Sequence, residues 1–207
     1  MLLCAQNSHL VVIDVQEKLL PNIGNHARIA ANIGFLMDAA AILQVPVVVT
    51  EQYPKGLGPT VEPLRHHPAA TNTLEKLRFS AAETLVTGVS ALGISETDVP
   101  PLPARQIVLA GIETHVCVQQ TALELNERGF QVFVAADSVG SRFPEDHHWG
   151  LQRMKSAGVI ITTAEAIAFE WCELAGHERF KTLSLLIRDR DSQRKELTSI
   201  DTPRSSE

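Results

Sequence analysis

The sequence predicts an α/β protein in which a parallel sheet carries helices on both faces. Short apolar runs rich in β-branched residues, segments with helical spacing, and the alternation of the two along the chain all indicate this class. Apolar runs that are too short for a helix and lack polar alternation are typical of buried parallel strands. Right-handed crossovers between such strands place the intervening helices on both faces of one sheet.

The first half of the chain contains two predicted strands around one long helix. Residues 9–15 (HLVVIDV) form the first strand, and apolar residues recur at helical spacing over residues 26–43. Residues 46–50 (PVVVT) form the second strand. Residues 51–71 are long and rich in Pro and Gly, and they follow a strand end directly. Loops at the carboxyl ends of parallel strands commonly bind ligands in such folds.

The second half repeats the same unit, and the chain should end in a polar tail. We predict strands over 106–110, 130–136 and 159–161, helices over 115–128 and 145–156, and a short helix with a Pro-rich connection over 84–103. The tail has no apolar periodicity, so we expect it to be disordered. The predicted organisation is one domain over residues 1–188 and a tail over 189–207.

Composition narrows the classes of partner and compartment. A chain of 207 residues can bury one substantial core. A net charge of -6 argues against binding nucleic acid, since phosphate-backbone binders usually carry a basic surplus. No apolar run approaches the roughly 18–20 residues that cross a bilayer. The three cysteines are widely spaced and odd in number, which predicts free thiols and a cytoplasmic location.

Three residues near predicted strand ends carry candidate chemistry. Asp14 lies at the mouth of an apolar strand, where a carboxylate must be paired or solvated. Cys117 lies in the first turn of a helix that Thr114 should cap, and a helix N-terminus lowers the pKa of a thiol. Lys76 follows a strand-like stretch. Taken singly, the three residues also fit a turn cap, a buried structural cysteine and a solvated surface lysine.

The motifs around these residues resemble the isochorismatase-like hydrolases. VVIDVQ, EKLRFSA and GIETHVCV occur in the order and spacing of that family. TEQYPKGLGPTV, ADSVGSR and TTAEAIAFEW resemble the branch that contains the metazoan isochorismatase-domain proteins. The resemblance covers residues 9–188 and implies a three-layer αβα sandwich with a six-stranded parallel sheet.

The resemblance also implies a role for each matched residue. Cys117 matches the family's nucleophile, Asp14 its general acid and base, and Lys76 the third member of the triad. A cis peptide would join Ile112 to Glu113, and the backbone N–H groups of Glu113 and Cys117 would form the oxyanion hole. Glu51, Tyr53, Phe79 and Thr114 flank these segments as candidate pocket residues.

The sequence departs from the nicotinamidase branch of this family after the second strand. Nicotinamidases carry an Asp-x-His…His metal cluster there, whereas this chain has Glu51, Gln52 and Tyr53. One carboxylate beside a tyrosine makes a poor zinc site, so we expect no catalytic metal and no cofactor.

These observations predict a metal-independent cysteine hydrolase that acts on a small-molecule amide, imide or ester through a thioester. Two alternatives stay open. One is isochorismatase-type hydrolysis of a vinyl ether, which would not need the thiol. The other is a non-enzymatic oligomeric scaffold, because a fold does not establish a function. Residues 167–174 and 180–187 are apolar enough to pack between subunits, so we expect a homo-oligomer.

Overall fold

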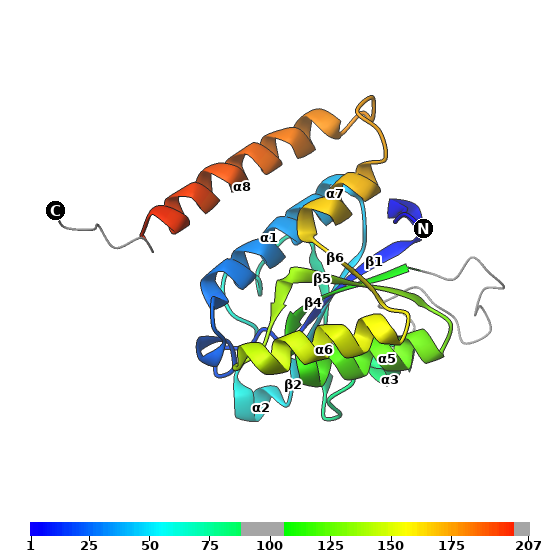
Figure 1. Cartoon of the computed structure of the whole chain (residues 1–207), viewed down its shortest axis with the longest axis vertical. Helices are drawn as coiled ribbons and strands as arrows, with labels where there is room; N and C mark the ends of the chain where they lie inside the picture. The colour runs from blue at the N-terminus through cyan, green and yellow to red at the C-terminus, as the bar shows by residue number, and fades with distance from the viewer. Residues whose placement is uncertain (88–105, 201–207) are drawn as a thin grey trace.

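Six parallel strands form one sheet at the centre of the computed structural model, which describes residues 1–87 and 106–200 (Figure 1). The strand order is β3-β2-β1-β4-β5-β6. The strands are β1 (Ser8–Ile13), β2 (Val47–Gln52), β3 (Ala70–Lys76), β4 (Gln106–Ile112), β5 (Gln131–Gly140) and β6 (Ile160–Thr162). This sheet confirms the α/β class and the six-stranded parallel architecture.

Helices cover both faces of the sheet and complete the three layers (Figure 1). One layer contains α1 (His26–Leu43) and α7 (Ala164–Cys172), with α8 (Phe180–Ile200) lying over them. The opposite layer contains α3 (Ala82–Thr87), α5 (Gln119–Glu127) and α6 (Pro144–Ser156). The short helix η1 (Ala5–Asn7) precedes β1, and η2 (Leu20–Asn22) and α2 (Pro54–Leu57) lie in the connections between elements.

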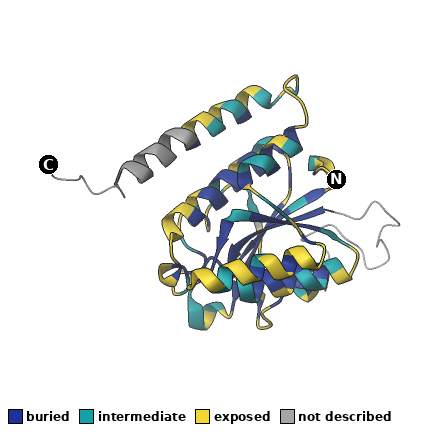
Figure 2. Cartoon of the chain, in the orientation of Figure 1, coloured by how far each residue is buried: buried dark blue, intermediate teal, exposed yellow. Residues whose placement is uncertain are grey.

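Strand β1 shows why the apolar runs lack polar alternation. Successive side chains of a strand point to opposite faces, and both faces of this sheet are covered. Leu10 and Val12 pack with α1 and α7, whereas Val11 and Ile13 pack with α5 and α6. All four side chains are fully buried, and buried positions line the centre of the sheet (Figure 2).

The predicted disordered tail is wrong for residues 189–200, because α8 continues to Ile200. Arg190 anchors this part of the helix. Its guanidinium forms ion pairs with Asp137 at 3.0 Å and Glu165 at 3.2 Å, and it lies 4.2 Å from the centre of the Phe35 ring. Arg190 holds the helix through ion pairs and not through an apolar face. The sequence of residues 189–200 therefore showed no apolar periodicity that would predict a helix. Residues 201–207 lie outside the described part of the chain.

Two other predictions concern α3 and the C-terminal apolar segments. The short helix predicted near residue 84 is α3, but the Pro-rich connection that follows begins at residue 88 and lies outside the described residues. The apolar stretches 167–174 and 180–187 mostly pack within the chain. Ile167, Trp171 and Leu183 are buried, while Phe169, Leu174 and Leu185 remain exposed.

Strands β1 and β4 lie side by side at the centre of the sheet, although their following crossovers run to opposite faces. Helix α1 leads from β1 to β2 over one face, and α5 leads from β4 to β5 over the other. Ligands in such sheets bind where the crossovers diverge, at the carboxyl ends of the strands. Within the described residues, no helix combines the length and apolar character needed to cross a membrane.

Candidate active site

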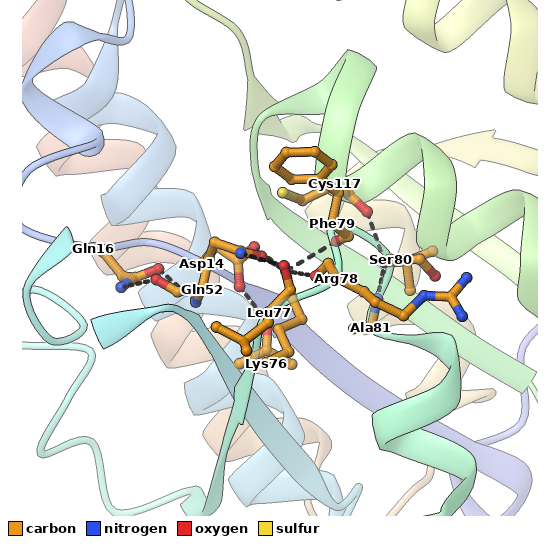
Figure 3. Close-up of polar contacts among 12 residues, drawn as sticks. Asp14, Gln16, Gln52, Lys76, Leu77, Arg78, Phe79, Ser80, Ala81 and Cys117 are labelled. Carbon is orange, nitrogen blue, oxygen red and sulfur yellow. Dashed lines mark hydrogen bonds and ion pairs between the residues drawn. The ribbon is translucent and has the colours of Figure 1, made fainter. Parts of the chain in front are cut away.

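The three candidate residues meet at the carboxyl edge of the sheet (Figure 3). Asp14 directly follows β1, and Lys76 is the last residue of β3. Cys117 lies in a π-helical turn, η3 (Thr114–Val118), which follows β4. Because β2 separates β1 from β3, the long lysine side chain has to reach past the end of β2 to contact Asp14.

Asp14 and Lys76 form a buried ion pair. The Lys76 Nζ lies 2.6 Å from the Asp14 Oδ2, and both side chains are almost completely excluded from solvent. The Thr50 hydroxyl donates a 2.7 Å hydrogen bond to the other carboxylate oxygen. A buried charge needs both an opposite charge and hydrogen bonds, and this carboxylate has both. The arrangement excludes the reading of Lys76 as a solvated surface residue.

The backbone at the ends of β1 and β4 is held in close contact. Asp14 has a φ of 51°, in the left-handed region, and this turn directs the chain out of the strand. Gly111 pairs with Ile13 in the neighbouring strand and has a φ of 124°. A Cβ at position 111 would lie 2.1 Å from the Ile13 carbonyl oxygen, so only glycine allows this approach.

The turn that carries Cys117 differs from the regular helix start expected from the sequence. The peptide bond between Ile112 and Glu113 is cis, at the position that the resemblance implied. The Glu113 carbonyl accepts hydrogen bonds from the N–H groups of Val116 and Val118, at 3.1 and 3.2 Å. Thr114 is therefore not the N-cap. Its buried side chain hydrogen-bonds the His147 Nδ1 at 2.9 Å, which ties the turn to α6.

The Cys117 thiol is held in its protonated form. Burial raises its pKa to about 12, and the negative charge of the neighbouring Asp14 carboxylate adds to the rise. The Lys76 ammonium and the Glu113 N–H lower the pKa but do not outweigh burial. The expectation of a thiolate stabilised by the helix N-terminus is therefore wrong for the free protein. Asp14 instead stands ready to accept the proton when the sulfur attacks.

Alkylation should reveal this protonated state directly. At pH 8 a thiol with a pKa of about 12 is ionised in only about 10⁻⁴ of the molecules. We therefore expect iodoacetamide to modify the exposed Cys4 well before Cys117, with peptide-resolved mass spectrometry as the measurement. The Cys117 rate should then rise about tenfold for each pH unit up to that pKa. Preferential labelling of Cys117 at neutral pH would contradict this assignment.

The candidate pocket residues divide into two groups. Tyr53 and Phe79 are more than half exposed. The backbone carbonyl of Phe79 accepts a hydrogen bond from the Lys76 Nζ at 2.9 Å. In Figure 3 the Phe79 ring points toward Cys117, so the reading of Phe79 as a core residue does not hold. Glu51 and Thr114 are buried. The Glu51 carboxylate accepts hydrogen bonds from the backbone and hydroxyl of Thr60, which fastens the loop after β2.

Sequence reasoning missed several polar residues that support the triad. Thr50 hydrogen-bonds Asp14, and Gln52 contacts Lys76. Gln16 in turn bonds the backbone of Gln52. Threonine and glutamine side chains do not by themselves indicate catalysis. The only signal in the sequence was their position at or just after the ends of β1 and β2.

The described residues contain no group of three or more His, Cys, Asp or Glu side chains arranged to hold a metal ion. A cavity of about 800 Å³ lies elsewhere, between the N-terminal segment and the end of α7. None of the triad residues lines it.

Comparison with known proteins identifies the family of the chain. The isochorismatase domain family matches residues 8–166. A zebrafish (Danio rerio) protein described as isochorismatase domain-containing protein 2 is 34% identical over 186 residues, which cover 89% of each chain. A structure described as the MAR1 ribonuclease of Caenorhabditis elegans superposes with a TM-score of 0.80 at 37% identity, covering 90% of this chain and 92% of that one.

A second structure, the YcaC gene product of Escherichia coli, has a TM-score of 0.78 at 26% identity. The match covers 97% of this chain and 98% of that one. That protein is described as an octameric hydrolase of unknown specificity.

Proposed function

The chain belongs to the isochorismatase family of hydrolases, and from that premise we propose that it is a metal-independent cysteine hydrolase of small-molecule amides, imides or esters. The observation that carries the proposal is the position of Cys117 beside the buried Asp14–Lys76 ion pair at the carboxyl edge of the sheet (Figure 3). A nucleophile placed next to a base, which is itself held by a third group, is the arrangement that acyl transfer requires.

The reaction would proceed in two halves. As the sulfur adds to the substrate carbonyl, its proton passes to Asp14, and Lys76 keeps the carboxyl group in position. The backbone N–H groups of Glu113 and Cys117 would stabilise the developing oxyanion. Asp14 then returns the proton to the leaving amine or alkoxide, which leaves a thioester on Cys117. Water attacks the thioester with Asp14 as base, releasing the acid and the free thiol.

The last two residues of β2 support a mechanism without a metal. At the positions where nicotinamidases carry their metal cluster, the Glu51 carboxylate is engaged by Thr60. The Gln52 side chain is likewise engaged, by Lys76 and the Leu77 carbonyl. The buried thiol beside a base also favours acyl transfer over vinyl-ether hydrolysis, because ether hydrolysis makes no use of a nucleophilic sulfur.

A second candidate activity is RNA cleavage, which the description of the C. elegans neighbour as a ribonuclease favours. Exposed groups near the site would suit a single-stranded nucleic acid. Tyr53 and Phe79 offer aromatic faces, and Arg78 and Arg142 are more than half exposed. Against this, the net charge is -6 and both arginines already pair with glutamates.

We also propose that the chain acts in the cytoplasm as a homo-oligomer. We propose further that this oligomer is an enzyme and not a non-enzymatic scaffold. The octameric description of the YcaC neighbour supports assembly, and the exposed Phe169, Leu174 and Leu185 offer apolar contacts. A complete triad supports an enzyme. A monomeric mass in light scattering would contradict the assembly.

Mass spectrometry of the intact protein tests the proposed chemistry. The protein is exposed to a panel of small amides, imides and esters, with a single-stranded RNA in a parallel reaction. We expect an acyl adduct that maps to Cys117 and is absent from Cys117→Ala. Cleavage of the RNA by wild type and Cys117→Ala alike, without any adduct, would favour the second candidate activity.

A further inference from the structure

Two buried glutamines link the ends of β1 and β2. The Gln52 N–H donates to the Gln16 Oε1 at 2.8 Å, and the Gln16 Nε2 donates to the Gln52 carbonyl at 3.0 Å. The same Nε2 also donates to the Gly58 carbonyl at 2.6 Å. The Gln16 side chain thus pairs with both backbone groups of Gln52, as a neighbouring strand would. It holds the end of β2 at the point where the chain has already turned away at Asp14.

The side chain of Gln52 continues this contact toward the lysine. Its Oε1 accepts a hydrogen bond from the Lys76 Nζ at 2.8 Å, and its Nε2 donates to the Leu77 carbonyl at 2.7 Å. An ammonium can only donate and a carbonyl can only accept, so this orientation of the amide is determined by its partners. Gln52 and Lys76 are also direct neighbours in the register of β2 and β3.

The Lys76 ammonium has three N–H donors, and the Gln52 Oε1 accepts a hydrogen bond from one of them. The three shortest contacts of the Nζ are with the Asp14 Oδ2 at 2.6 Å, the Gln52 Oε1 at 2.8 Å and the Phe79 carbonyl at 2.9 Å. The Arg78 carbonyl is more distant, at 3.2 Å. Gln52 is therefore the only side chain besides Asp14 that orients the ammonium within the described residues.

We propose that Gln52, held in place by Gln16, is a positioning residue that fixes the Lys76 ammonium against Asp14 and thereby controls the reactivity of Cys117. The proposal rests on the function proposed above. The neutrality of the amide is central to it. A carboxylate at position 52 would compete with Asp14 for the ammonium and would add a negative charge close to the sulfur. Glutamine supplies an acceptor and a donor without either effect.

The test measures the alkylation rate of Cys117 between pH 8 and pH 10, where no substrate is needed. We expect Gln52→Glu to slow alkylation about tenfold or more at a given pH, which corresponds to a thiol pKa about one unit higher. Gln52→Met should move the profile in the same direction by less, because the ammonium loses an acceptor but meets no new charge.

Gln106→Glu provides the matched control. Gln106 is another buried glutamine with several hydrogen bonds, but it lies at the amino end of β4, at the opposite edge of the sheet. Both glutamate variants bury a new carboxylate and should lower the thermal midpoint, whereas only Gln52→Glu should shift the Cys117 profile. A merely structural role for Gln52 would leave that profile within twofold of wild type, which would overturn the proposal.

Gln52→Met keeps the proposal testable if Gln52→Glu does not fold, since an unshifted profile in that variant would overturn it equally. The outcome is separable from that of the proposed function. Failure to form an acyl adduct would reject the cysteine hydrolase, while the alkylation profiles would still report whether Gln52 acts on the thiol through Lys76.

Discussion

Replacing Cys117 with alanine is expected to lower kcat/KM by about 10⁴-fold or more, on any substrate that forms the adduct. Removing the nucleophile of a triad typically has effects of this size, because the remaining groups cannot provide an alternative covalent route. A factor of 10⁴ corresponds to about 5.5 kcal/mol of transition-state stabilisation. The measurement is steady-state turnover on the purified variant, after its thermal midpoint has been compared with that of wild type.

Cys172→Ala is the matched control for this prediction. Cys172 is also buried, and burial raises the pKa of its thiol too, but it lies in α7 on the far side of the sheet from α5. We expect this variant to keep wild-type turnover within a few-fold while losing some stability from the small cavity. Equal activity in Cys117→Ala and wild type would instead favour ether hydrolysis, for which the thiol is dispensable.

Replacing Lys76 with methionine should destabilise the fold more than a typical substitution. The variant would leave the Asp14 carboxylate buried without its cation, and breaking a buried ion pair from one side commonly costs about 3–5 kcal/mol. We expect this loss in the free energy of unfolding measured with urea at neutral pH. Lys155→Met, at an exposed position of α6, should change it by less than about 0.5 kcal/mol.

A double variant separates the ion pair from the packing of the lysine stem. If the cost comes from the unpaired carboxylate, Asp14→Leu combined with Lys76→Met should recover much of the lost stability, since neither charge remains. The combined variant should still be inactive, because it lacks the base. A double variant as unstable as the sum of the two single ones would show that Asp14 and Lys76 stabilise the fold independently.

The spacing of apolar residues along the chain predicted most of the buried helix and strand segments. The helix over residues 26–43 matches α1, and the apolar runs became the central strands with ends shifted by a few residues. The family motifs also identified Asp14, Lys76 and Cys117, which the structure brings together. Residue type alone had left each of them open to a structural reading.

Other features depend on the order of the strands and on the surroundings of each side chain. The lysine reaches Asp14 only because β3 lies beyond β2, and 62 residues separate the two partners along the chain. The π-helical turn replaces a regular helix start, and α8 extends through residues 189–200, which were predicted to be a disordered tail. Neither feature leaves a periodic pattern.

The sequence by itself determined the α/β class and the buried strands, because hydrophobic periodicity is a local property. Its family motifs also singled out Asp14, Lys76 and Cys117 as the candidate triad. The tertiary structure alone decided the protonation state of the Cys117 thiol. The pKa of Cys117 is raised because the folded chain buries the sulfur beside Asp14, and not lowered as its place near a helix start suggested. Desolvation and the distance between charges exist only after distant segments have packed together.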